Sequence, residues 1–245
     1  MARMETQPVA VTVSARDARL QGDLRLPPKA RGLVLFAHGS GSSRLSPRNR
    51  WVAEALDQRG LATLLIDLLT SEEEEVDDAT AQLRFDIPFL ARRLEAASDW
   101  LKARRETREL PLGLFGASTG AAAALAAAAA RPDDVRAVVS RGGRPDLAEE
   151  ALPRVEAPTL LIVGGDDREV LALNEAAARR MTAERRLDIV PGATHLFEEP
   201  GALEAVARLA GDWFLGHLSR PERCGLHDRR PEGRKISRNE GGGKP

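Results

Sequence analysis

The segment 116–120 places a serine between two glycines, at the point where a strand pattern changes into a helix pattern. An apolar run leads into Gly116-Ala117-Ser118-Thr119-Gly120, and ten residues without a charge follow. A Gly-x-Ser-x-Gly sequence at such a turn is typical of a nucleophile elbow, which holds a strained serine hydroxyl clear of the sheet. The chemistry available to such a serine is attack on a carbonyl carbon, beside the free N–H groups of a helix N-terminus.

A serine nucleophile requires a base, and the chain contains only four histidines. His38 precedes Ser118 in the chain. His217 ends the last predicted helix, and His227 lies in a polar C-terminal segment. His195 is the one that follows a predicted strand after the serine, so by elimination it is the expected base.

Two adjacent aspartates are candidates for the acid that orients the base. Asp166 and Asp167 follow the apolar run 157–165 directly, and His195 comes later in the chain. This order of serine, acid and histidine is the one expected when an elbow serine is catalytic. A serine before a helix also fits a plain N-cap, but the three types in this order favour a triad. The residues by themselves leave both aspartates open as the acid.

The segments that must position these residues alternate between strand and helix patterns. Segments 9–13 and 20–26 predict an antiparallel hairpin. A continuous apolar run predicts a strand covered on both faces at 32–39, and a second buried strand is expected at 61–69. Further strands are expected at 112–116, 135–140, 157–165 and 185–192. Helices are expected at about 47–59, 87–105, 121–130, 170–181 and 202–218, whereas the acidic segment 71–78 is expected to be solvated. The alternation predicts an α/β domain with a mostly parallel sheet of about eight strands and helices on both faces.

The loop after the strand at 32–39 is the expected partner of the serine. Sites in such sheets lie beyond the carboxyl ends of the strands, and this loop begins His38-Gly39-Ser40. The N–H of Ser40 and the N–H of Thr119 are therefore candidate donors to an oxyanion. A phosphate cradle is disfavoured, because the loop lacks the Gly-Lys-Ser/Thr ending of a P-loop. Asp67, after the next strand, is expected to be structural.

Four segments resemble the α/β-hydrolase superfamily, and more narrowly its dienelactone-hydrolase-like branch. They are HGSGSS, FGASTGAAAAL, PTLLIVGGDD and PGATHLFEEPGALEAV, and the resemblance extends over roughly residues 11–218. It implies Ser118 as nucleophile, Asp167 as acid and His195 as base, with the amides of Ser40 and Thr119 as oxyanion donors. Neither a cofactor nor a metal is expected.

The resemblance implies a serine hydrolase that cleaves a small carboxylic ester or lactone through an acyl-enzyme intermediate. Dienelactone hydrolase itself has a cysteine nucleophile, so the serine leaves its lactone substrate in doubt. Relatives of this type also resemble domains joined to phosphoribosyltransferases. The short connection 140–157 has no room for a large lid, and it carries Arg141 and Arg144 as candidate carboxylate-binding residues.

Other function classes fit the sequence less well. An acyltransferase or a non-catalytic member of the same fold remains the alternative. A nicotinamide-dependent reductase would show Gly-x-Gly-x-x-Gly after the first parallel strand, but the chain has HGSGSS there and contains no tyrosine. A net charge of −1 argues against a general nucleic-acid binder.

Composition gives the remaining expectations. Cys224 is the only cysteine, so no intramolecular disulfide can form. The chain shows no secretory signal and no apolar run long enough for a membrane span, which predicts a cytoplasmic protein without a membrane partner. Residues 1–218 are expected to form the hydrolase domain. Residues 219–245 are expected to be a disordered basic tail, with eight Lys/Arg against four Asp/Glu. The oligomeric state is left open.

Overall fold

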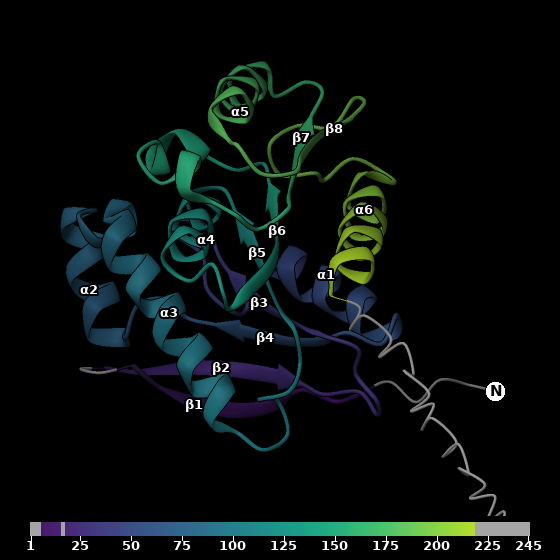
Figure 1. Cartoon of the computed structure of the whole chain (residues 1–245). Coiled ribbons are helices and arrows are strands. Elements are labelled where there is room, and N and C mark those ends of the chain that lie inside the picture. The colour runs from purple at the N-terminus through teal and green to yellow at the C-terminus, as the bar shows by residue number, and fades with distance from the viewer. Residues whose placement is uncertain (1–5, 16–17, 219–245) are drawn as a thin grey trace, which may run out of the picture.

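An eight-stranded sheet forms the centre of the molecule (Figure 1), in a computed structural model that describes residues 6–15 and 18–218. The strand order is β1-β2-β4-β3-β5-β6-β7-β8. The strands are β1 (Val9–Ala15), β2 (Ala18–Arg25), β3 (Leu33–Ala37), β4 (Ala62–Ile66), β5 (Leu112–Ala117), β6 (Val135–Arg141), β7 (Thr159–Gly164) and β8 (Arg185–Val190). β1 pairs with β2, and β2 with β4, in antiparallel fashion, whereas every other pair is parallel. The predicted hairpin and the predicted mostly parallel sheet are confirmed.

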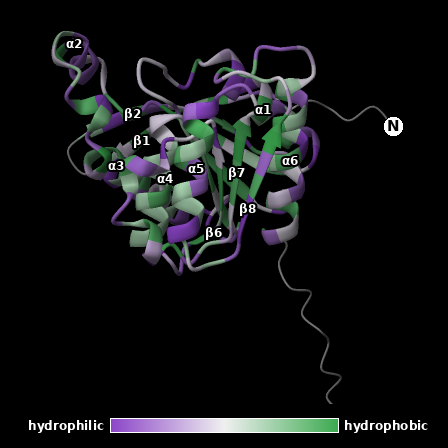
Figure 2. Cartoon of the chain, turned by 90° about the horizontal axis from the view of Figure 1, so that it is seen from above, coloured by the Kyte–Doolittle hydropathy of each residue, from purple (hydrophilic) through white to green (hydrophobic). Residues whose placement is uncertain are grey.

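Helices cover both faces of the sheet. One face carries α1 (Pro47–Gln58) and α6 (Ala202–His217), and the other carries α3 (Ile87–Ala103), α4 (Thr119–Ala130) and α5 (Arg168–Arg180). Figure 1 shows α1 and α6 on one side of the strands, with α3 and α4 on the opposite side. Figure 2 shows hydrophobic strands enclosed between these helix layers. Every residue of β3, β4, β5 and β7 is buried, because strands covered on both faces need apolar side chains in both directions.

The acidic segment after β4, expected to be solvated, is a helix whose residues are mostly exposed. α2 (Ser71–Thr80) begins with a capping box between Thr70 and Glu73. Asp77 is buried in it and accepts hydrogen bonds from the amides of Leu83 (2.7 Å) and Arg84 (3.0 Å). The Arg84 Nε also donates to Asp77, at 2.6 Å. One carboxylate of the acidic run is therefore used to fold the turn into the short helix η1 (Leu83–Phe85).

The connection from β6 to β7 contains only two 3₁₀ helices, η2 (Pro145–Ala148) and η3 (Leu152–Arg154). The expectation that this connection has no large lid is therefore met. No helix in the described part of the chain is long and apolar enough to cross a membrane. The predicted tail, residues 219–245, lies outside the described residues.

Candidate active site

Ser118 occupies the sharp turn between β5 and α4, with φ +51° and ψ −122°. A residue with a side chain rarely adopts this backbone conformation, which is strained. The flanking glycines are required by space. A Cβ on Gly116 would lie 2.4 Å from the Cα of Ala121, and a Cβ on Gly120 would lie 2.4 Å from the carbonyl oxygen of Ala37. The turn is therefore built as the glycine pattern predicts.

Replacing Gly116 by alanine is expected to lower the free energy of unfolding by about 1–3 kcal/mol or more, because the new methyl group meets backbone that cannot move aside. Gly216→Ala in α6 is the matched control, since nothing lies within 4 Å of its added Cβ. The control should change stability by less than about 1 kcal/mol, in the stabilising direction. Urea unfolding measures both variants. Equal midpoints for the two would show that the elbow does not need Gly116.

The structure brings Ser118, His195 and Asp167 into one hydrogen-bonded chain. His195 Nε2 lies 3.3 Å from Ser118 Oγ, and His195 Nδ1 lies 2.7 Å from Asp167 Oδ2. The histidine side chain is 38% exposed, whereas the aspartate side chain is 14% exposed. The first distance is slightly long for a strong hydrogen bond, as is common for catalytic contacts without substrate. The arrangement has the geometry of a nucleophile, a base and an orienting acid.

Asp166 does not approach the histidine ring. Its side chain is exposed, and its backbone N–H donates to the carbonyl of Ala193 at 3.0 Å. Asp167 is the N-cap residue of α5, but its carboxylate makes no capping hydrogen bond and instead contacts His195. Of the two adjacent aspartates, it is therefore Asp167 whose carboxylate lies against the histidine ring.

The loop after β3 lies directly against the nucleophile. A Cβ on Gly39 would be 3.0 Å from Ser118 Cβ. The Arg44 N–H donates to Asp67 Oδ1 at 2.7 Å, and the Arg44 guanidinium pairs with the same carboxylate. The expectation that Asp67 is structural is therefore confirmed. Beside the nucleophile, the N–H of Ser40 donates to Thr119 Oγ1 at 2.8 Å, so this amide already has an acceptor within the protein.

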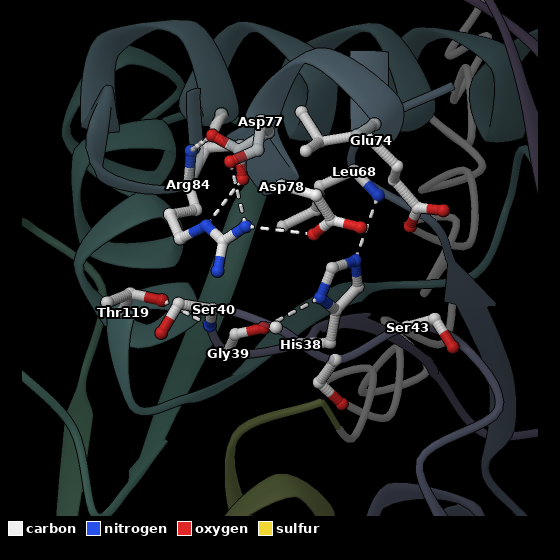
Figure 3. Close-up of a pocket in the computed structure, with 14 residues that line it drawn as sticks. His38, Gly39, Ser40, Ser43, Leu68, Glu74, Asp77, Asp78, Arg84 and Thr119 are labelled. Atoms are coloured by element: carbon white, nitrogen blue, oxygen red, sulfur yellow. Dashed lines mark hydrogen bonds and ion pairs between the residues drawn. The ribbon is translucent and has the colours of Figure 1, made fainter. Parts of the chain in front are cut away.

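A pocket of about 300 Å³ opens beside Ser40 and Thr119 (Figure 3). One wall is the loop 39–43, and the other comes from α2 and η1. Its polar lining includes the carboxylates of Glu74, Asp77 and Asp78. Burial raises the pKa of Glu74, and the negative charges of Asp67 and Asp78 add to this rise. The pocket is therefore suited to a small polar group rather than to a long alkyl chain.

The pocket adjoins the elbow through Thr119, but Ser118, Asp167 and His195 do not line it, and neither do the two arginines proposed for substrate binding. The guanidinium of Arg144 makes a bidentate hydrogen bond to Asp146, with Nε and Nη2 at 2.9 Å and 2.8 Å from the two carboxylate oxygens. Arg141 is 7% exposed, and its Nη2 donates to Asn49 at 3.3 Å. Burial lowers the pKa of Arg141 to about 10, and the charge of nearby Arg48 adds to this effect. These contacts favour structural roles for both arginines.

Sequence reasoning missed the pocket wall made by α2 and η1, including Arg84 and Glu74. Their position in the chain could have indicated this role. The segment follows β4 and therefore lies at the carboxyl edge of the sheet, where binding sites form. His38, expected only to begin the loop beside the serine, also lines the pocket. Within the described residues, no group of three or more His, Cys, Asp or Glu side chains is arranged to hold a metal ion.

Comparison with known proteins matches the chain to one family. A model of the dienelactone hydrolase family matches residues 22–213. The crystal structure of a dienelactone hydrolase from Anabaena variabilis is 62% identical, covers 88% of this chain and 100% of its own, and superposes with a TM-score of 0.86. Est1E from Butyrivibrio proteoclasticus has a TM-score of 0.73 at 17% identity, covers 86% of this chain and 99% of its own, and shows the same fold.

A longer relative carries a different name. A Mycobacterium tuberculosis protein named "Putative phosphoribosyl transferase" is 58% identical over 211 residues, which is 86% of this chain and 47% of that protein. The chain thus spans about half the length of this curated relative. The transferase name describes the longer protein as a whole.

Proposed function

The chain belongs to the dienelactone hydrolase family, and from this premise we propose that it is a serine hydrolase of small carboxylic esters or lactones. The observation that carries the proposal is the hydrogen-bonded chain from Ser118 through His195 to Asp167. Family and fold support a hydrolase. The choice of ester or lactone substrates and the catalytic roles of the three residues are the proposal.

In the acylation step, Ser118 Oγ attacks the carbonyl carbon of the substrate while His195 Nε2 takes the hydroxyl proton. Asp167 holds the proton of His195 on Nδ1, so Nε2 is free to accept, and its charge stabilises the imidazolium that forms. The imidazolium then gives its proton to the leaving oxygen, and the ester bond breaks. The product of this step is an acyl group on Ser118.

The developing oxyanion lies at the N-terminus of α4. The first N–H groups of a helix have no partner within the helix, and the N–H of Thr119, directly after the nucleophile, is one of them. The loop that carries Ser40 forms the facing wall. Donors placed in advance at this point stabilise charge that exists only in the transition state and the tetrahedral intermediate.

Hydrolysis, rather than transfer to another acceptor, is favoured by the access of water to the base. The side chain of His195 is 38% exposed, and the β6–β7 connection supplies no lid over it. Water can therefore reach Nε2, lose a proton to it and attack the acyl carbon. The bond from that carbon to Ser118 Oγ then breaks, the imidazolium returns its proton to Oγ, and the carboxylic acid leaves. An acyltransferase would need a site that holds an acceptor and excludes water.

A panel of p-nitrophenyl esters, with lactones beside it, tests the proposed function. Acetate and butyrate esters are expected to be hydrolysed with the highest kcat/KM. The decanoate should be at least about tenfold slower, because its chain would cover the polar pocket lining and leave those groups without water. Each rate is followed by the release of p-nitrophenolate, and the lactones by the acid they produce.

Labelling with a fluorophosphonate gives an independent check, since the reagent phosphonylates only activated serines. The adduct should be found on Ser118 by peptide mass spectrometry. If no ester or lactone in the panel is turned over and Ser118 takes no label, the hydrolase is of another substrate class or the triad is inactive, and the proposal is withdrawn.

A further inference from the structure

The peptide group between Gly39 and Ser40 is held on both of its sides (Figure 3). The carbonyl oxygen of Gly39 lies 3.0 Å from His38 Nδ1. On the other side, the N–H of Ser40 donates to Thr119 Oγ1 at 2.8 Å. In a trans peptide the C=O and the N–H point in opposite directions. The two hydrogen bonds therefore fix the same orientation of this peptide plane.

The hydrogen bond at His38 Nε2 determines which nitrogen of the ring carries the proton. The N–H of Leu68 donates to His38 Nε2 at 3.0 Å, so this nitrogen is an acceptor. Burial lowers the pKa of His38, against smaller opposing effects of the Gly39 carbonyl and Asp67, and the ring is therefore neutral at pH 7. Its single proton is on Nδ1 and is donated to Gly39. The Gly39–Ser40 peptide group cannot flip without losing this hydrogen bond. The bond therefore keeps the Ser40 N–H directed at Thr119 Oγ1.

The Thr119 hydroxyl accepts from this amide and belongs to the residue that directly follows the nucleophile. Thr119 is 4% exposed as a residue and lines the pocket. A hydroxyl has one proton to donate besides the lone pairs that accept. Oγ1 accepts from Ser40, and within residues 6–15 and 18–218 no group accepts the hydroxyl proton. That proton is therefore available to a bound molecule.

We propose that the Thr119 hydroxyl is the second oxyanion donor, alongside the N–H of Thr119. The Ser40 amide then acts through this hydroxyl: by donating to Oγ1, it polarises the O–H and strengthens the bond that the O–H gives to the oxyanion. The inference rests on the proposed serine hydrolase function. It changes one part of the expected site, since the Ser40 amide supports a donor and does not contact the oxyanion itself.

Thr119→Val is the test, because valine keeps the branched shape and removes the hydroxyl, while the backbone N–H stays. The kcat for a short-chain ester is expected to fall by about 10²-fold, the usual loss for one oxyanion donor, with little change in KM. Thr119→Ser, which restores the hydroxyl, should be close to the wild type. Thermal unfolding of both variants checks that the fold is intact.

A thionoester with the same acyl and leaving groups distinguishes a hydrogen-bond-donor role of the Thr119 hydroxyl from a purely structural role. Its charge develops on sulfur, which is a weaker hydrogen-bond acceptor than oxygen. The loss caused by Thr119→Val should therefore be clearly smaller for the thionoester than for the ester. A purely structural role would lower both rates by the same factor.

Two outcomes overturn the inference. A Thr119→Val enzyme as fast as the wild type, or faster, would mean that the hydroxyl only competes for the Ser40 amide. Equal losses on ester and thionoester would make the hydroxyl structural. In both cases a wild type that hydrolyses esters and an inactive Ser118→Ala variant would leave the proposed function standing, whereas an inactive wild type would overturn both.

Discussion

Replacing Ser118 by alanine is expected to lower the kcat of ester hydrolysis by about 10⁴-fold or more. Its Oγ is the atom that becomes acylated, and it lies 3.3 Å from His195 Nε2. Without it, the base has no nucleophile to activate, and only binding and the oxyanion donors remain. The measurement is kcat with a short-chain p-nitrophenyl ester, together with the melting temperature. That temperature should not fall, because alanine and serine are equally strained at φ +51°.

Ser14→Ala is a matched control, since it removes the same hydroxyl from an exposed position on β1, far along the sheet order from β5. Its turnover should equal that of the wild type. Purified Ser118→Ala that keeps more than a tenth of wild-type turnover would rule out Ser118 as the nucleophile. Contamination by another esterase is checked by titrating active sites with the fluorophosphonate.

Asp167→Asn is expected to lower kcat by about 10⁴-fold, a loss of the size measured when a triad aspartate becomes asparagine. The Asp167 carboxylate accepts from His195 Nδ1 at 2.7 Å, which keeps the proton on that nitrogen and leaves Nε2 free for Ser118. Asparagine has nearly the same shape, but it lacks the charge and can present its NH₂ group to the ring. The wrong tautomer then places a proton on Nε2. The same ester assay measures the loss.

Asp166→Asn is the control for this variant, because it makes the same chemical change at the adjacent position. Its side chain is exposed, and the ring nitrogen His195 Nδ1 bonds the Asp167 carboxylate instead, so a loss of less than about tenfold is expected. An inactive Asp166→Asn with an active Asp167→Asn would reverse the assignment and leave the hydrolase function intact. Full activity of both variants would contradict the triad itself.

The parallel part of the sheet was predictable from local pattern alone. Runs such as 160–163 are apolar at every position, as is typical of a strand covered on both faces. The hairpin of β1 and β2 could be distinguished because its residues alternate. α2 was less predictable. Its acidic residues suit solvent, and it is stabilised by a capping box and by the contact between Asp77 and Arg84, two interactions that no periodicity reveals.

The identity of the catalytic candidates also came from chain order and from exclusion. Gly116 and Gly120 are needed because a Cβ at either position would lie 2.4 Å from a backbone atom. This requirement is visible in the sequence as the two glycines that flank Ser118. His195 was identified because His38 precedes the serine, His217 ends the last helix and His227 lies in the polar C-terminal segment. Arg141 and Arg144 show the limit of this reasoning. Arg144 follows β6 as expected, whereas Arg141 is the last residue of that strand, and their partners Asp146 and Asn49 decide where each guanidinium points.

The sequence by itself determined the order of the strands along the chain, the elbow, and the types of residue available beside it. Residue type and local spacing are properties of the chain, so they can be read before it folds. Only the tertiary structure decided that Asp167 rather than Asp166 meets His195, and that the Ser40 amide points at the Thr119 hydroxyl. Both depend on the direction of single groups across loops 28 and 79 residues apart in the chain. That direction is determined by packing and hydrogen bonds among segments that the sequence does not place together.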